Sequence, residues 1–255
     1  MGLMAGVVCG LTGVFVVLWR MSLLGICISH AAFAGALIGL WLGWPPLAGG
    51  LLASLAAASA LGPLTERPNL SLDTAIGLVF AVMLSLAIMA LGLLPGAKSE
   101  GLSLMWGSLL SASRPDLILL ALNAGALITF VILFFKEIQA IIGQRRAALA
   151  AGIPVRPIYY GCLILMGLSM AVCLKAVGGL LIYALVVTPA ATAMQLSYSL
   201  RKVFLLSAVF GAGASIIGLW LSLQLGWPSG AAIVLTSAAG LVLALIFSPK
   251  KAFLN

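Results

Sequence analysis

The clearest candidate for chemistry in this sequence of 255 residues is its single histidine, His30. Cys27 precedes it by three positions, which puts the two side chains on one face if this segment is helical. Neutral imidazole is the commonest metal ligand among side chains, and a cysteine thiolate is a soft one. His30 and Cys27 are therefore candidate metal ligands. Spacing alone also allows a histidine hydrogen-bonded to a neighbouring helix, beside a cysteine that packs as a small hydrophobe.

Carboxylates, the other groups on which acid–base or metal chemistry depends, are few. The sequence has five, and all fall in loops or near the ends of apolar segments: Glu66, Asp73, Glu100, Asp116 and Glu137. No buried carboxylate pair is thus expected for catalysis or proton relay. One histidine cannot complete a metal site by itself, and no recognisable ATP-binding motif is present. We therefore expect no enzyme activity, no catalytic residue and no cofactor bound by this chain.

The composition indicates the environment of these side chains. Hydrophobic residues make up 64% of the chain, charged residues 7%, and the mean hydropathy is +1.27. A soluble domain carries about 25% charged residues, so nearly every face of this protein must meet lipid or other protein. The net charge of +8 comes from basic residues that stand singly or in pairs between apolar runs. No basic patch with interleaved aromatic residues exists, which argues against nucleic-acid binding.

Apolar segments long enough to cross a bilayer, which takes roughly 20 residues, predict an all-α polytopic membrane protein with a single domain over residues 1–255. There are about nine such segments, or eight if the first or the Gly- and Pro-broken seventh does not fully cross. They fall at about 2–19, 22–43, 45–63, 74–94, 115–135, 157–174, 176–197, 203–226 and 229–248. Most boundaries coincide with proline or glycine, Pro63 among them.

Basic residues predict the orientation. If Arg20 is cytoplasmic, ten of the thirteen Lys and Arg residues fall on that side: Arg20, Arg67, Lys136, Arg145, Arg146, Arg156, Arg201, Lys202, Lys250 and Lys251. Lys98, Arg114 and Lys175 remain outside. The cytoplasmic excess of Lys and Arg in membrane proteins makes this the expected topology, with a cytoplasmic C-terminus.

Two of the loops between apolar segments are each predicted to contain a short helix. The external stretch 95–114 is apolar in part but too short to cross, which favours an interfacial or re-entrant helix. The cytoplasmic stretch 136–156 is amphipathic, and residues 147–151 predict a helix that Gly152 ends, with Pro154 beyond. Such a helix is either a docking element for a soluble partner or a connector on the membrane surface.

Several ordered motifs resemble those of the membrane permeases of manganese/zinc/iron ABC importers. The first runs from Phe15 to Gly25 and continues at Ser29–His30–Ala31. The others are Asp73–Gly77, Trp106–Leu110, Lys175–Leu181 continuing to Pro189–Ala193, and Pro228–Leu235. Because their order, their spacing and the total length match, the resemblance covers essentially the whole chain.

The resemblance implies the permease subunit of an ATP-driven importer in a prokaryotic inner membrane, with the ABC importer permease fold. Two such chains would form a homodimer, two ABC ATP-binding subunits would hydrolyse ATP on the cytoplasmic side, and an extracytoplasmic protein would deliver a divalent metal ion as substrate. A cytoplasmic helix followed by glycine couples to the ATPase in this family. Residues 144–156 match it, with Gly152 at the glycine and Arg145 and Arg146 on the helix.

Three departures bear on the cargo. Ile26 stands where the family pattern has an aspartate before the histidine, Gly226 replaces an acidic residue, and Arg146 replaces an acid of the coupling helix. Mn²⁺ prefers oxygen ligands, whereas Zn²⁺ accepts nitrogen and sulfur. Zinc is therefore favoured over manganese or iron, and a non-metal or chelated cargo is an alternative.

Two other classes of function remain. An ion-gradient-driven secondary transporter would need a titratable or oxygen-rich site at the middle of the membrane, and no intramembrane carboxylate is expected here. A membrane scaffold that has lost transport would tolerate the missing aspartate. Transport that depends on ATP would distinguish an importer from a secondary transporter. A chain that assembles with partner subunits but transports no substrate would be a scaffold.

Overall fold

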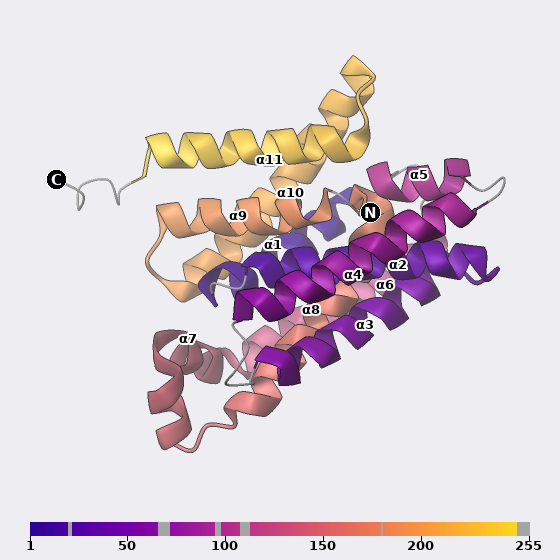
Figure 1. Ribbon diagram of the computed structural model, residues 1–255. Coiled ribbons are helices and arrows are strands. Elements are labelled where there is room, and N and C mark those ends of the chain that lie inside the picture. Colours follow the sequence, from indigo (N-terminus) through magenta and orange to yellow (C-terminus); the bar gives the residue numbers. More distant parts are fainter. Residues whose placement is uncertain (20–21, 66–71, 95–97, 108–112, 180, 249–255) are drawn as a thin grey trace.

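A computed structural model describes residues 1–19, 22–65, 72–94, 98–107, 113–179 and 181–248. Regular structure over these residues is entirely helical (Figure 1). In chain order the helices are α1 (Gly2–Leu18), α2 (Ser22–Trp41), α3 (Pro46–Thr65), α4 (Leu72–Leu93), α5 (Lys98–Trp106), α6 (Arg114–Leu133), α7 (Phe135–Ala150), α8 (Val155–Val177), α9 (Ile182–Leu196), α10 (Leu200–Leu225) and α11 (Ser229–Ile246).

The predicted apolar segments all appear as helices. Seven helices in the described part of the chain are long and apolar enough to cross a membrane, and α1 and α9 are apolar but shorter, with 17 and 15 residues. These two are the first and seventh segments, the ones for which the sequence left a complete crossing open. The expected all-α polytopic membrane protein is therefore confirmed.

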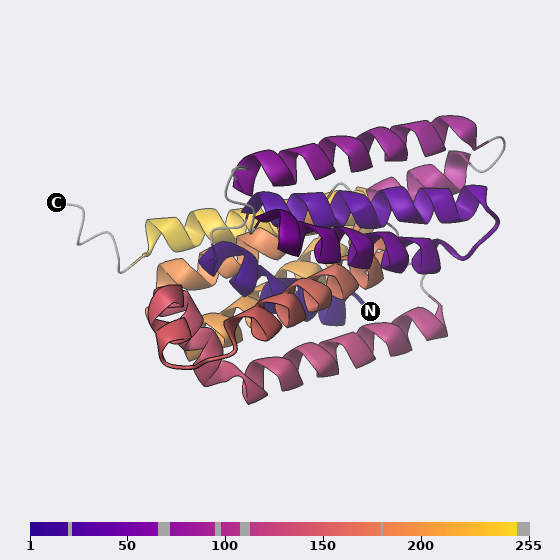
Figure 2. The same cartoon turned by 60° about the horizontal axis from the view of Figure 1, so that its bottom comes forward.

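The helices lie side by side in one bundle, with α2 and α8 at its centre. In each of these two spans 72% of the residues are buried, against 17% in α4. In Figure 1 α4 runs across the front of the bundle, and Figure 2 shows it along one outer edge with α6 along the opposite one. The central helices bury large apolar side chains from three elements, including Phe15, Ile28 and Met166. Burial thus separates a protein-facing core from outer helices whose apolar faces are exposed.

Small residues bring neighbouring helices into close approach. A Cβ atom on Gly6 would lie within 3.0 Å of the backbone of Gly211, and one on Gly10 would meet the backbone of Ser207. Lipid supplies no hydrophobic drive between helices, so van der Waals contact at such crossings stabilises the bundle. The contacts join α1 to α10 within one chain, so these glycines pack helices of the same bundle.

Proline positions correct one predicted boundary. Pro63 does not end the third segment, because α3 continues to Thr65. Near the end of a helix its missing N–H removes a single backbone hydrogen bond, which the last turn tolerates. Pro115 and Pro157 lie in the first turns of α6 and α8, where the N–H has no intrahelical partner.

A short helix, α5, forms within the stretch 95–114, as expected. It has nine residues and packs against α2, α8 and α11. Gly107 follows it with a φ of +77°, and a Cβ there would meet the backbone of Val177. The Gly179 N–H donates to the Leu104 carbonyl at 3.0 Å. These contacts hold α5 across the end of the bundle where α8 gives way to α9.

Charge is divided between the two ends of the bundle. The start of α10, the start of α8 and helix α7 lie at one end, and they carry Lys136, Arg145, Arg146, Arg156, Arg201 and Lys202. Arg114 and Lys175 belong to the other end, at the start of α6 and the end of α8. Outside the described residues lie five charged residues, namely Arg20, Glu66, Arg67, Lys250 and Lys251. Residues 108–110 of the Trp106–Leu110 motif lie outside them as well. Which end faces the cytoplasm stays a prediction.

Candidate functional site

His30 lies in the third turn of α2 and is 9% exposed. Its Nδ1 lies 3.0 Å from the carbonyl oxygen of Ile26, one turn earlier, and the Ser29 hydroxyl donates to the same oxygen at 2.8 Å. A carbonyl can only accept a hydrogen bond, so Nδ1 must carry the proton. The remaining ring nitrogen, Nε2, then holds the lone pair that a metal ion needs.

Nε2 has no hydrogen-bond partner among the described residues, so it is available to a ligand. The ring packs edge-on against Phe80 of α4, with centroids 4.9 Å apart. Phe80 belongs to the outermost spanning helix, only 17% of which is buried. The histidine therefore sits between the buried centre of the bundle and the helix most open to a partner. A carbonyl that fixes the tautomer of a histidine is the arrangement typical of metal-ligating imidazoles.

Cys27, the second candidate ligand, is fully buried in the central core. No hydrogen bond joins its Sγ to His30 within the described residues. In addition, no group of three or more His, Cys, Asp or Glu side chains in the described part of the chain could hold a metal ion together. Among the described residues, His30 is therefore an imidazole with an available nitrogen that no cluster of further ligands surrounds.

Two positions at which the family pattern has an acidic residue, 26 and 226, lie in different parts of the structure. Ile26 is half-buried on the same helix as His30, one turn before it, so a carboxylate there would share its face. Gly226 instead ends α10 with a φ of +68° in the turn before α11. Glycine at such a left-handed position satisfies a geometric need of the helix end. At position 26 the missing carboxylate changes the helix face that carries His30. At position 226 the glycine that replaces the acid forms the turn between α10 and α11.

The stretch 136–156 folds into a helix that ends as predicted. Gln144 has non-helical angles (φ −159°, ψ 99°), which divides α7 into two segments. The second segment ends where Gly152 adopts a φ of +78°. The Gly152 N–H donates to the Leu149 carbonyl at 3.1 Å, and the Ile153 N–H donates to the Ala148 carbonyl at 3.1 Å. This pair of bonds is the Schellman motif, in which glycine at the left-handed position closes a helix.

Most side chains of this second segment of α7 point away from the protein. Arg145, Arg146 and Leu149 are exposed, with Leu149 at 53%, while Ala148 is buried against the bundle. The Arg145 guanidinium lies 5.2 Å from the centre of the Tyr159 ring on α8. Figure 1 shows α7 standing outside the bundle of spanning helices. One face anchors the segment and the other presents basic and apolar side chains, as a protein docking surface requires. The coupling role of Arg145, Arg146 and Gly152 stays a prediction.

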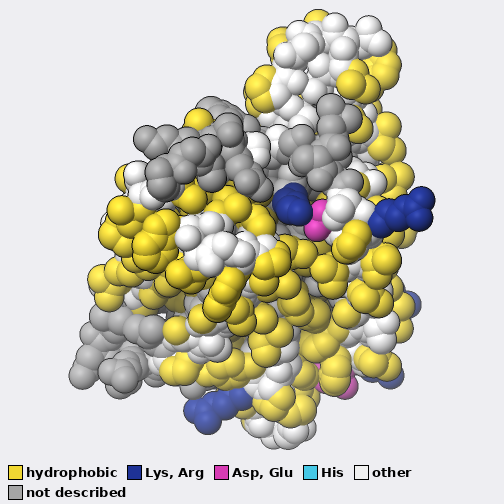
Figure 3. Space-filling model, turned by 90° about the vertical axis from the view of Figure 1, so that its right-hand side faces the viewer, with side chains coloured by type: hydrophobic (Ala, Val, Ile, Leu, Met, Phe, Trp, Pro, Cys, Tyr) yellow, Lys and Arg dark blue, Asp and Glu magenta, His cyan; other side chains and the backbone are white. Residues whose placement is uncertain are grey.

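One polar contact was not foreseen. Lys175 Nζ lies 3.1 Å from the Asp116 carboxylate, joining α8 to the start of α6, and both the N–H and the hydroxyl of Ser113 donate to that carboxylate. The pair lies at the end of the bundle that carries α5, which faces the viewer in Figure 3, where acidic and basic side chains touch amid a largely hydrophobic surface. The Ser-x-x-Asp spacing at 113–116 is a readable capping signal. The partner, 59 residues away, has no signal in the sequence.

In the described part of the chain, nine apolar helices, a buried histidine with an available nitrogen and a glycine-capped helix outside the bundle are features that a membrane permease would need. The model of the ABC 3 transport family matches residues 1–248, and the chain belongs to this family. It is 33% identical over 257 residues to the manganese transport system membrane protein MntC of Halalkalibacterium halodurans, covering 99% of this chain and 87% of that protein. The chelated iron transport system membrane protein YfeD of Yersinia pestis is 28% identical, with 98% and 84% covered.

A solved structure supports the same assignment. PsaBC from Streptococcus pneumoniae in complex with Fab superposes with a TM-score of 0.88 at 30% identity, covering 99% of this chain and 91% of that one. The expected resemblance to divalent-metal ABC permeases is therefore confirmed, and with it the permease fold. The chain is a multi-pass membrane permease of a metal-transporting family.

Proposed function

We propose that this chain is the permease subunit of an ATP-driven importer that moves a divalent first-row metal ion into the cytoplasm of a prokaryotic cell. The observation that carries the proposal is His30, whose Nδ1 is held by a backbone carbonyl while Nε2 has no partner among the described residues. Membership of the ABC 3 transport family and similarity to metal-transport permeases support the proposed class of cargo and the proposed use of ATP. His30 is the proposed ligand on the path, and Cys27 is the proposed second donor.

The donor chemistry and the relatives favour different ions. An imidazole, with at most a thiol beside it, favours zinc over manganese, which prefers oxygen ligands. The similar proteins named above carry manganese and chelated iron in their names. The preference for zinc rests on the side chains near His30 alone, so manganese and iron are the cargoes against which it must be compared.

The assembly we propose has two copies of this chain, two ATP-binding subunits at α7 and a metal-binding protein on the opposite face. The exposed apolar side chains of α4, among them Leu78, Val82 and Met89, support a second copy beside the helix that covers His30. The exposed Arg145, Arg146 and Leu149 support docking of the ATP-binding subunits. In this arrangement His30 of each copy would lie near the shared path, and the C-terminus would be cytoplasmic.

Uptake into liposomes tests the function. The chain is reconstituted with its ATP-binding subunit, ATP is enclosed inside, and the binding protein is supplied outside with Zn²⁺, Mn²⁺ or Fe²⁺. We expect ATP-dependent uptake of one ion that His30→Ala abolishes. Thr12→Ala is the matched control, because it removes a buried polar group whose hydroxyl bonds only within α1. Normal flux in His30→Ala would remove the histidine from the path, and uptake without ATP would indicate a secondary transporter.

A chelated cargo is the second candidate, and one observation favours it. No group of three metal-binding side chains forms among the described residues, and a chelate brings its own ligands. If no free ion moves while the intact complex hydrolyses ATP, uptake of the chelated metal is measured next. Assembly and hydrolysis without flux of either form would indicate a scaffold.

A further inference from the structure

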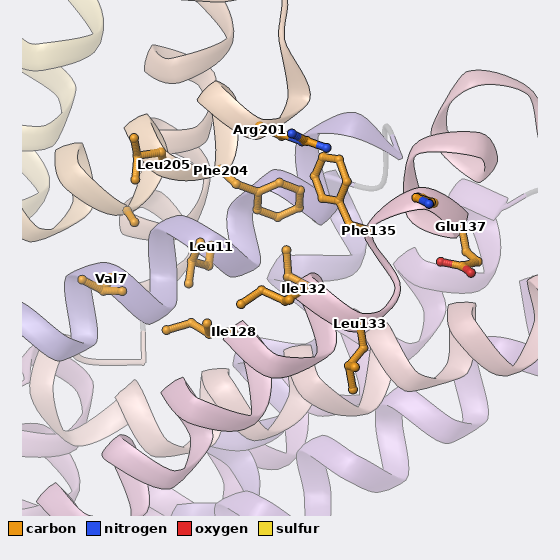
Figure 4. A pocket seen from close by; sticks show the side chains of 13 residues that line it. Val7, Leu11, Ile128, Ile132, Leu133, Phe135, Glu137, Arg201, Phe204 and Leu205 are labelled. Atoms are coloured by element: carbon orange, nitrogen blue, oxygen red, sulfur yellow. The ribbon is translucent and has the colours of Figure 1, made fainter.

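A groove of about 830 Å³ lies between α1, α6 and α10, beside the junction of α6 with α7 (Figure 4). Its walls are apolar and come from three helices, with Val7 and Leu11 on α1, Ile128 and Ile132 on α6, and Leu205 on α10. Ile132 and Leu205 are 70% and 67% exposed. The function proposed above uses none of these side chains.

One end of the groove is charged. Arg201 and Lys136 line it together with Glu137, and Figure 4 shows Arg201, Phe135 and Glu137 at the end opposite to Val7 and Ile128. The Arg201 guanidinium lies 5.4 Å from the centre of the Phe135 ring. In the described part of the chain neither Arg201 nor Lys136 forms an ion pair. Two basic groups and one acidic group leave the mouth positive.

This combination selects one kind of ligand. A soluble anion would use the basic mouth but would gain nothing from walls formed by membrane-spanning helices. A neutral hydrocarbon would use the walls but not the charges. An amphiphile with an anionic headgroup uses both, and basic pockets between spanning helices on the cytoplasmic side bind such headgroups. The topology predicted from the basic residues would put this mouth at the cytoplasmic leaflet, which contains anionic lipids.

We propose that the groove binds one anionic glycerophospholipid, with its phosphate between Arg201 and Lys136 and the upper part of one acyl chain along α1, α6 and α10. Arg201 begins α10 and Lys136 begins α7, so the phosphate bridges the bundle to the helix that leads to Gly152. This binding does not depend on which substrate the permease carries. Glu137 opposes the phosphate and weakens the site.

Native mass spectrometry of the full-length chain tests this site. The protein is stripped of lipid in detergent and titrated with phosphatidylglycerol or with phosphatidylcholine of the same acyl chains. We expect one tightly held phosphatidylglycerol per chain, bound about tenfold more tightly than phosphatidylcholine because two cations face the headgroup. Arg201→Gln is expected to weaken it about fivefold, and Leu205→Trp, which fills the groove, to remove both lipids.

Two variants separate the site from general surface charge. Lys202→Gln makes the same charge change one residue further along α10, at an exposed position outside the groove, and should leave binding unchanged. Glu137→Gln should strengthen phosphatidylglycerol binding, a gain that misfolding cannot mimic.

Four results would overturn the proposal. Equal loss in Arg201→Gln and Lys202→Gln would mean that only surface charge attracts the lipid. Equal binding of the two lipids would mean that the apolar walls alone hold them. Displacement by inorganic phosphate at the lipid's own concentration would indicate a site for a free anion. Cross-linking of Leu205→Cys to a second copy or to the ATP-binding subunit would show that protein fills the groove.

Discussion

The hydrogen bond from His30 Nδ1 to the Ile26 carbonyl decides which ring nitrogen can bind a metal ion. It also places Ile26 one turn before the imidazole, on the same helix face. An oxygen donor at this position would complete a pair of ligands without any movement of the backbone. Of the three departures from the family pattern, Ile26 is thus the one that shares a helix face with His30.

Replacing Ile26 by aspartate should therefore move ion preference toward manganese, which prefers oxygen ligands. We expect Ile26→Asp to raise manganese uptake relative to zinc by about tenfold, a change that needs ~1.4 kcal/mol of differential binding. Competition between the two ions in the liposome assay measures the ratio. Ile26→Asn is the matched control, since it has nearly the same shape without the charge. An unchanged ratio in Ile26→Asp would mean that this face does not meet the cargo.

The Asp116–Lys175 pair should stabilise the bundle through its charges. Breaking a buried ion pair on one side leaves an uncompensated charge. Lys175 is 27% exposed, and water screens part of the interaction, so we expect Asp116→Asn to lower the free energy of unfolding by about 2 kcal/mol. The double variant Asp116→Asn/Lys175→Met should recover part of this loss. Thermal unfolding in detergent compares both variants with the parent protein, and a double variant no more stable than Asp116→Asn would show that the unpaired Lys175 charge is not the cause of the loss.

At the scale of whole elements, the crossing of α1 with α10 depends on the absence of side chains. A Cβ on Gly10 would meet the backbone of Ser207, whereas one on Gly213, also on α10, has nothing within 4 Å. We expect Gly10→Ala to destabilise the protein by about 1–3 kcal/mol through overpacking. Gly213→Ala should instead stabilise α10 by roughly 0.5–1 kcal/mol. Thermal unfolding of the two variants checks this, and equal effects would argue against a close crossing.

The second segment of α7 ends at a left-handed glycine, so its direction depends on Gly152. At a φ of +78°, alanine costs about 1–2 kcal/mol, and proline cannot adopt the conformation at all. We expect Gly152→Pro, and charge reversal at Arg145 and Arg146, to uncouple ATP hydrolysis from transport. Gly143→Ala is a suitable control, because a Cβ there meets nothing within 4 Å. If substrate still stimulates hydrolysis in Gly152→Pro, this helix is not the docking element.

For the molecule as a whole, the sequence predicted what depends on periodicity and composition. The apolar segments, the short helix before Gly107 and the helix end at Gly152 all follow from local patterns. The end of the third segment was predicted at Pro63, but α3 continues to Thr65, because the last turn of a helix tolerates a proline. The Asp116–Lys175 pair and the groove beside Arg201 could not be predicted, since they join residues far apart in the chain. The same limit applies to His30, whose contact with Phe80 depends on the packing of α2 on α4.

Topology is the last property of the whole molecule that can be tested directly. Trp44 lies in the turn between α2 and α3, and Leu149 lies on α7, at opposite ends of the bundle, and both are exposed. The four native cysteines are buried, so they should not react with a membrane-impermeant thiol reagent and need no replacement. In intact cells stripped of outer barriers, the reagent should label Trp44→Cys and spare Leu149→Cys, and in inverted vesicles the pattern should reverse. This expectation rests on the ten basic residues at one end of the predicted topology against three at the other. The opposite labelling pattern would place α7 outside the cell, where no ATP-binding subunit could reach it. The mouth of the lipid groove would then face the outer leaflet.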